Sequence, residues 1–202
     1  MTPPIVERLR EAAASLEAER VSMGAMARAH GPEAQGTLLL LLAMPCLLPV
    51  PGVGFVLGAG MVGLAAAMWR GHANHGLPQR VADLELPRHW AQRVLLGLAS
   101  AYAVAARHSR ARLSHVAGPA FRAATAIAVG LMAFIVLLPI PLGNLLPSIA
   151  IMLIGVGLVF RDGLAVLLGH VMAVLALVIT SGALLLVWIL GSEWATGWIP
   201  GW

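Results

Sequence analysis

Lysine is absent from this 202-residue chain, tyrosine occurs once, and charged residues make up only 11% of the sequence. The single cysteine, Cys46, cannot form a disulfide within the chain, which excludes a secreted disulfide-rich fold. The low charge excludes an ordinary soluble enzyme, because soluble domains carry about 25% charged residues. It also excludes intrinsic disorder, which requires a polar and highly charged composition.

Hydrophobic residues account for 59% of the chain, whereas soluble domains contain about 45–50%. Because a soluble fold cannot bury that much apolar surface, we predict an all-α integral membrane protein. All 13 basic residues are arginine, and the net charge is +4. No motif that reads nucleic acid accompanies them. We therefore expect the arginines to mark the cytoplasmic face and to contact anionic lipid headgroups, with no nucleic acid as a partner.

Three stretches contain no charged residue: residues 34–69, 123–160 and 163–192. The third accommodates a helix at residues 164–190 that crosses the bilayer, which takes about 20 apolar residues. The first two are interrupted by prolines and glycines: Pro49, Pro51 and Gly52 in one, and Pro139, Pro141, Gly143 and Pro147 in the other. Two prolines one residue apart prevent a continuous helix, and each arm is shorter than the hydrocarbon core. We predict two broken-helix, re-entrant hairpins.

The two interrupted stretches resemble each other. The motif Leu-Pro-x-Pro occurs at residues 48–51 and again at residues 138–141. After a one-residue shift two further matches follow: Gly52 with Gly143, and Arg70 with Arg161. We interpret the pattern as an internal repeat. Paired broken helices in the two halves of a membrane protein indicate a polar site near the bilayer midplane.

The predicted organisation has five segments: N-terminal cytoplasmic amphipathic helices at 1–35, the first broken-helix repeat at 36–70, an arginine-rich cytoplasmic or interfacial segment at 71–122, the second repeat at 123–162, and a transmembrane helix with a tryptophan-rich tail at 163–202. Within the first segment an amphipathic helix is predicted at residues 5–20. Ser22 is predicted to cap a second short helix that ends near Gly31.

The membrane topology follows from the arginines. No arginine or lysine comes after Arg161, so the positive-inside rule places every loop up to this residue in the cytoplasm. Both hairpins then enter and return, and only residues 164–190 cross. Residues 94–106 form either an interfacial helix, which we favour, or a short transmembrane helix, because arginines bracket only 13 residues there.

The sequence from Leu138 to Gly169 resembles the ExoD family of bacterial exopolysaccharide-synthesis membrane proteins. It carries the family's Pro-x-Pro, followed by Asn144 and Pro147, and then an apolar helix that ends in Asp162 and a glycine. The resemblance extends over roughly residues 15–190. It implies a protein of the bacterial inner membrane that supports exopolysaccharide synthesis or export, but it does not supply a reaction.

Five residues are candidates for substrate binding. Asn144 either binds a substrate or satisfies carbonyl groups that the prolines leave free. Arg161 and Asp162 either form a neutral pair that turns the chain, or present a guanidinium to a phosphate or carboxylate. Arg70 is the repeat-related counterpart of Arg161. His170, an intramembrane histidine, either relays protons or is solvated near the interface.

No catalytic residue or cofactor is predicted. A metal site is not predicted either, because His72 and His75 have no carboxylate or cysteine nearby that completes a zinc site. Six glycines are interpreted as small residues that let helices pack closely: Gly54, Gly58, Gly60, Gly63, Gly155 and Gly157.

Transport or flipping of an anionic or lipid-linked substrate is the function we favour. The alternative is a non-transporting scaffold for a polysaccharide synthase, which makes the polysaccharide-synthesis machinery a candidate partner. A membrane-embedded transferase or phosphatase ranks third, because no paired acid and base is visible. We also expect a homodimer, since a second copy would cover the backbone at the breaks.

Overall fold

The computed structural model describes residues 4–30, 35–48, 53–71, 79–108, 113, 115–138 and 143–197. Five residues of the predicted breaks lie outside this part of the chain: Pro49, Pro51, Gly52, Pro139 and Pro141. The helices on either side of both breaks are described. Gly143 precedes the helix Leu145–Phe160, but Pro147 lies within the first turn of this helix, where a proline is tolerated, so its assignment to the break was wrong.

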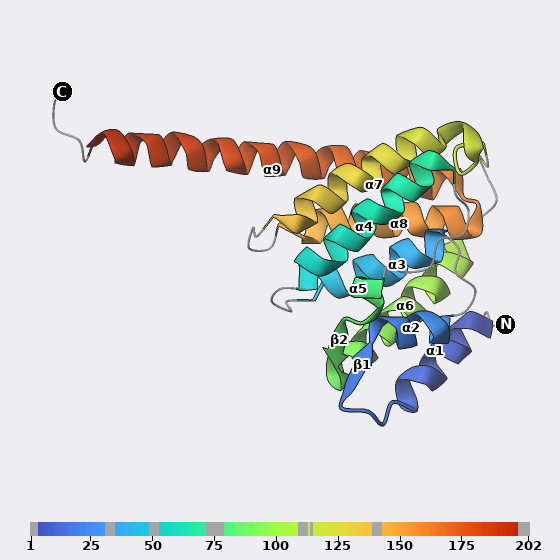
Figure 1. Cartoon of the computed structure of the whole chain (residues 1–202). Coiled ribbons are helices and arrows are strands. Elements are labelled where there is room, and N and C mark those ends of the chain that lie inside the picture. Colours follow the sequence, from blue (N-terminus) through green and yellow to red (C-terminus); the bar gives the residue numbers. More distant parts are fainter. Residues whose placement is uncertain are drawn as a thin grey trace.

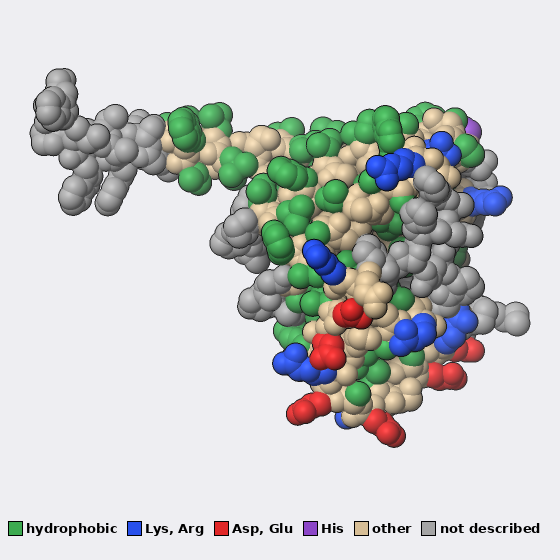
Figure 2. Space-filling model, in the orientation of Figure 1, with side chains coloured by type: hydrophobic (Ala, Val, Ile, Leu, Met, Phe, Trp, Pro, Cys, Tyr) green, Lys and Arg blue, Asp and Glu red, His purple; other side chains and the backbone are tan. Residues whose placement is uncertain are grey.

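Two layers make up the molecule (Figure 1). The apolar layer consists of α3 (Gln35–Cys46), α4 (Val53–Arg70), α7 (Arg122–Leu137), α8 (Leu145–Phe160) and α9 (Gly163–Gly197). The charged layer consists of α1 (Pro4–Ala14), β1 (Arg20–Ser22), α2 (Met23–His30), α5 (Gln79–Ala82), β2 (Glu85–Pro87) and α6 (Arg88–His108). A short 3-10 helix, η1 (Pro119–Phe121), leads into α7. On the face seen in Figure 2, acidic side chains lie only on the charged layer.

The N-terminal segment folds as part of the charged layer. Helix α1 buries Val6 and Leu9 and packs on α6. It ends at Ala14, so the helix predicted over residues 5–20 is too long. The predicted cap is confirmed, because the backbone N–H of Ala25 donates to the hydroxyl of Ser22 at 3.2 Å, at the start of α2.

A two-stranded antiparallel ribbon joins β1 to β2, with Val21 opposite Leu86. Both side chains are buried beneath the ribbon. The prediction of an all-α protein missed this ribbon, because strands of three residues are too short to show an alternating pattern. The rest of the described secondary structure is helical, as predicted.

Helix α6 contains residues 94–106, for which we considered both an interfacial helix and a short transmembrane helix. It belongs to the charged layer and is not among the helices apolar enough to span a membrane. Its buried face, which includes Val94 and Leu98, packs on α1 and α3. The ring of Tyr102 contacts the ring of Phe160 on α8, with 6.0 Å between centroids. Burial raises the pKa of the Tyr102 phenol, which therefore stays neutral.

The apolar layer pairs helices from different predicted repeats: α3 packs on α8, and α4 on α7. The first pair approaches closely at Gly36 and Gly155, where a Cβ on either glycine would lie 2.8–3.0 Å from the carbonyl oxygen of the other. The predicted close packing is therefore confirmed at Gly155, as it is at Gly58 against α7. Close packing is not seen at Gly63, where no atom of the described residues lies within 4 Å of such a Cβ.

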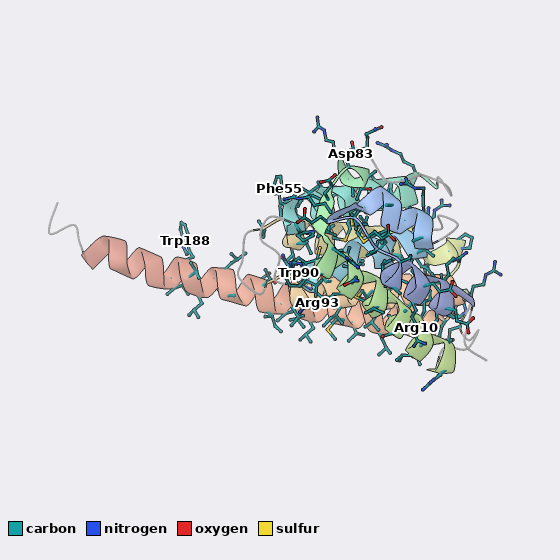
Figure 3. The ribbon with its side chains drawn as sticks, turned by 90° about the horizontal axis from the view of Figure 1, so that it is seen from below. Arg10, Phe55, Asp83, Trp90, Arg93 and Trp188 are labelled. Carbon is teal, nitrogen blue, oxygen red and sulfur yellow. The ribbon has the colours of Figure 1, made fainter. Side chains whose placement is uncertain are left out.

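Three helical segments are long and apolar enough to cross a membrane: Val53–Arg70, Pro119–Leu137 and Gly163–Ile189. The third is the predicted transmembrane helix. The first two segments are longer than expected, because each arm of the interrupted stretches was predicted to be shorter than the hydrocarbon core. Helices α3 and α8 are also apolar, but they are shorter than these spanning segments. The described part of α9 continues well past the other helices, and Trp188 on this projecting part is 75% exposed (Figure 3).

Candidate functional site

The helix ends that flank the two interruptions lie at the same end of the apolar layer (Figure 1). Here α3 and α7 end, and α4 and α8 begin; we call it the break end. At the opposite end, α4 ends at Arg70, α7 begins at Arg122 and Arg161 follows α8; we call it the arginine end. The predicted site residues are thus divided, since Asn144 lies at the break end while Arg70, Arg161 and Asp162 lie at the arginine end.

Asn144 links the two helices that begin at the break end. It occupies the N-cap position of α8, yet its side chain makes no capping hydrogen bond. Its amide reaches α4 instead, where Nδ2 lies 2.7 Å from the position that a Cβ on Gly54 would take. The other amide atom, Oδ1, is buried and has no hydrogen-bond partner among the described residues. Gly54 therefore provides the space for this amide.

Ser148 follows one helical turn after Asn144 and is completely buried. Its hydroxyl also has no hydrogen-bond partner in the described part of the chain. The Cys46 thiol from α3 interacts with this hydroxyl. The thiol donates its own hydrogen bond to the carbonyl of Leu42 at 3.4 Å, so it offers Ser148 only the weak acceptor of a sulfur atom. We call Asn144, Ser148, Gly54 and Cys46 the break cluster.

The helix termini add positive potential to the break cluster. Both α4 and α8 begin here, so the positive ends of two helix dipoles lie together. The first turn of α8 contains Pro147, which has no N–H, so Leu145 and Leu146 supply the backbone N–H groups that precede it in this turn. Amide, hydroxyl and backbone N–H groups bind hydroxyl or phosphate oxygens. They do not supply an acid and a base for catalysis.

The sequence alone did not lead us to assign Gly54 or Ser148 to a polar site. Ser148 is the only hydroxyl residue in α8, and it is four residues after Asn144, a spacing that places both on one helix face. That signal was available. The approach of Gly54 to Asn144 was not, because it depends on how α4 and α8 meet.

Asp162 has a structural role at the arginine end. It is buried, and its Oδ1 accepts a hydrogen bond from the backbone N–H of Leu164 at 3.1 Å. The carboxylate thus caps α9, a role that was not predicted from the sequence. Arg161 is exposed and has left-handed backbone (φ 53), which ends α8. Binding of an anionic group by Arg161 stays a prediction.

Arg70 is exposed at the last position of α4. The guanidinium of Arg122 lies over the next residue, with Nη1 3.0 Å from the position of a Cβ on Gly71. Gly71 adopts a φ of +78, which favours glycine and ends the helix. The arginines of α4 and α7 are therefore neighbours.

His170 belongs to neither end. Its neighbour Gly169 packs against Ala150 and Ile154, about halfway along α8. Nδ1 lies 2.8 Å from the carbonyl of Val166, and because a carbonyl only accepts, Nδ1 is the donor. Nε2 is buried without a hydrogen-bond partner among the described residues. A proton relay through His170 stays a prediction.

Among the residues that the structure describes, no group of three or more histidine, cysteine, aspartate or glutamate side chains is placed to hold a metal ion. Layers segregated by charge, with three helices of spanning length, define a helical membrane protein. The chain belongs to the family described as "Exopolysaccharide synthesis, ExoD", which matches residues 5–182. The resemblance seen in the sequence is thereby confirmed.

A curated relative supports the assignment. The chain is 35% identical over 144 residues to Protein ExoD of Rhizobium meliloti (strain 1021). This match covers 67% of the chain. The match spans only 60% of the relative's length, so the chain corresponds to part of that protein. No solved structure matches the chain.

Proposed function

We propose that this protein transports or flips an anionic or lipid-linked substrate in the bacterial inner membrane and thereby supports exopolysaccharide production. The family supplies the link to exopolysaccharide synthesis. The observation that supports transport is the break cluster, where Asn144 and Ser148 hold buried polar atoms without hydrogen-bond partners among the described residues. Each such atom costs about 1–3 kcal/mol of stability. A bound substrate that supplies hydrogen bonds would remove this cost.

Helix lengths support a position of the break cluster inside the bilayer. Helix α8 lies antiparallel to α9 (Figure 1), and its 16 residues measure about 24 Å. The apolar segment Gly163–Ile189 has 27 residues and measures about 40 Å. The break end therefore lies past the middle of this segment. We infer that the hairpins enter from the cytoplasm and return, and that α9 alone continues to the opposite face.

The chemistry of the break cluster suits a substrate that must leave again. Two helix N-termini stabilise a phosphate or carboxylate, and the Asn144 amide and Ser148 hydroxyl supply hydrogen bonds. All these groups are neutral. A neutral site holds an anion less tightly than an arginine would, and transport requires both binding and release.

Replacing Ser148 by alanine tests this function. We expect Ser148→Ala to keep or raise the melting temperature of the purified protein, because an unpartnered hydroxyl is removed. Exopolysaccharide output in a deletion strain should nevertheless fall, because the substrate loses a hydrogen bond. Ser100→Ala is the control: this exposed hydroxyl on α6 donates to the carbonyl of Leu96 at 2.9 Å, and its loss should leave output unchanged.

Full output from Ser148→Ala, at membrane levels equal to those of the unaltered protein, would contradict transport through the break cluster. It would favour the second candidate, a scaffold for a polysaccharide synthase. The observation that supports a scaffold is the charged layer, which exposes acidic and basic side chains to any cytoplasmic partner (Figure 2). In that case, charge changes on this layer should lower output instead.

A further inference from the structure

The arginine end carries exposed positive charge from three helices. Arg70, Arg122 and Arg161 are all exposed there, and Figure 2 shows basic side chains gathered at this end of the apolar layer. The sequence has no Asp or Glu at residues 34–82 or 86–161. The next acidic residue, Asp162, is buried and caps α9. Among the described residues of the apolar layer, the exposed charge at this end is therefore of one sign.

The charged layer differs in this respect. Its exposed acidic residues are interspersed with arginines: Glu7, Glu11, Glu17, Glu19, Asp83 and Glu85. An anionic surface attracts the arginine end and has little net attraction for the charged layer. The distribution of charge thus selects one end of the molecule for contact with anions.

Exposed apolar side chains continue directly from the arginines. Trp69 precedes Arg70 and is 56% exposed, and the outward face of α7 exposes Ile127 and Phe134. Arginine, then tryptophan, then aliphatic and aromatic side chains is the order in which a bilayer presents phosphates, the interface and acyl chains. A soluble anion would not require the apolar part of this surface.

We propose that Arg70, Arg122 and Arg161 bind the phosphates of anionic phospholipids, and so set the depth to which the hairpins insert. Guanidinium groups bind phosphate oxygens through charge-assisted hydrogen bonds. The lipids neutralise three like charges on a surface where the acidic residue nearest in sequence, Asp162, is buried and caps α9. This binding is independent of the transport function, because it uses the end of the layer opposite the break cluster.

Spin-labelled lipids test the proposal on the full chain. The purified protein is placed in bilayers of equal parts phosphatidylcholine and phosphatidylglycerol. Electron paramagnetic resonance then measures which labelled lipid is held at the protein surface. We expect the unaltered protein to prefer phosphatidylglycerol, and the preference to disappear in the triple variant Arg70→Gln, Arg122→Gln, Arg161→Gln. Replacement of the same residues by lysine should retain most of it, because lysine keeps the charge.

The control removes equal charge from the charged layer, through Arg10→Gln, Arg20→Gln and Arg28→Gln, and should retain the preference. The three single glutamine variants extend the test if the triple variant does not fold, and each should lower the preference in part. A preference that survives the arginine-end changes, or falls equally in the control, overturns the proposal. Loss of the preference on adding inorganic phosphate at constant ionic strength would also overturn it, by showing a site for a free anion.

Discussion

Asn144 and Gly54 form the most specific contact in the break cluster. The amide of one residue occupies the space that a side chain on the other would fill. Asn144 forgoes the usual role of an N-cap residue, since its side chain does not bond to the first turn of α8. Its amide is instead placed between two helix N-termini. Substrate binding at the break cluster therefore depends on the position of this one amide.

Gly54→Ala tests that position. The added methyl would lie 2.7 Å from Nδ2 and must displace the amide, while alanine itself favours a helix by about 1 kcal/mol over glycine. We expect the variant to insert normally and to produce less exopolysaccharide. Gly63→Ala on the same helix is the matched control, because no atom of the described part of the chain lies within 4 Å of its new methyl. Equal output from both variants would show that the amide position is unimportant.

Asp162 offers a second test at this scale. Asp162→Ala removes the cap on α9 and should cost about 1 kcal/mol of stability, measured as a lower melting temperature in detergent. Asp162→Asn keeps an oxygen that accepts the N–H of Leu164 and should remain near the original melting temperature. If both variants lower the melting temperature equally, the negative charge of Asp162 matters more than its hydrogen bond. That result would favour the interpretation of Arg161 and Asp162 as an ion pair.

Sequence reasoning identified Asn144 because an amide beside prolines stands out in an apolar stretch. The cap by Ser22 was also predictable, because capping is local in sequence. Gly54 and Ser148 were not assigned to the site. The spacing of Ser148 from Asn144 places both on one helix face and could have identified Ser148. The approach of Gly54 to Asn144 depends on how α4 and α8 pack, which no local pattern reveals.

At the scale of elements, prolines and uncharged stretches predicted where helices end. α3 and α7 end before the Pro-x-Pro motifs, and α4 and α8 begin after them. Which helices pair was not predictable: the contact of Gly36 with Gly155 joins helices from opposite halves of the chain. The ribbon of β1 and β2 was missed, since only the packing of the charged layer stabilises such short strands.

Replacing Pro139 and Pro141 together by alanine tests the break between α7 and α8. A proline inside a helix costs about 3 kcal/mol, so the variant can extend its helices without that penalty. We expect unchanged or higher stability, greater helicity by circular dichroism, and loss of exopolysaccharide output. Pro119→Ala, at an exposed position in η1, is the control and should retain output. Full output from the double variant would show that function does not require the break.

At the scale of the whole molecule, the two layers define how the protein can meet a membrane. Apolar side chains are exposed on α4, α7 and α9, whereas the exposed charged side chains that the structure describes lie on the charged layer and at the arginine end. α9 continues past the break end (Figure 1). Composition predicted the membrane and the long last helix. It did not predict that α6 joins the N-terminal helices in one layer, because that requires long-range packing between α1 and α6.

The central claim is that both hairpins enter from the cytoplasm and only α9 crosses. Single cysteines in a Cys46→Ser background, replacing His30, Glu85, His115 or Thr196, test it with a membrane-impermeant maleimide. The account predicts that the first three positions react only from the cytoplasmic side and that position 196 reacts only from the outer side. Reaction of positions 30 and 115 from opposite sides would contradict it, because the two hairpins would then enter from opposite faces as inverted repeats.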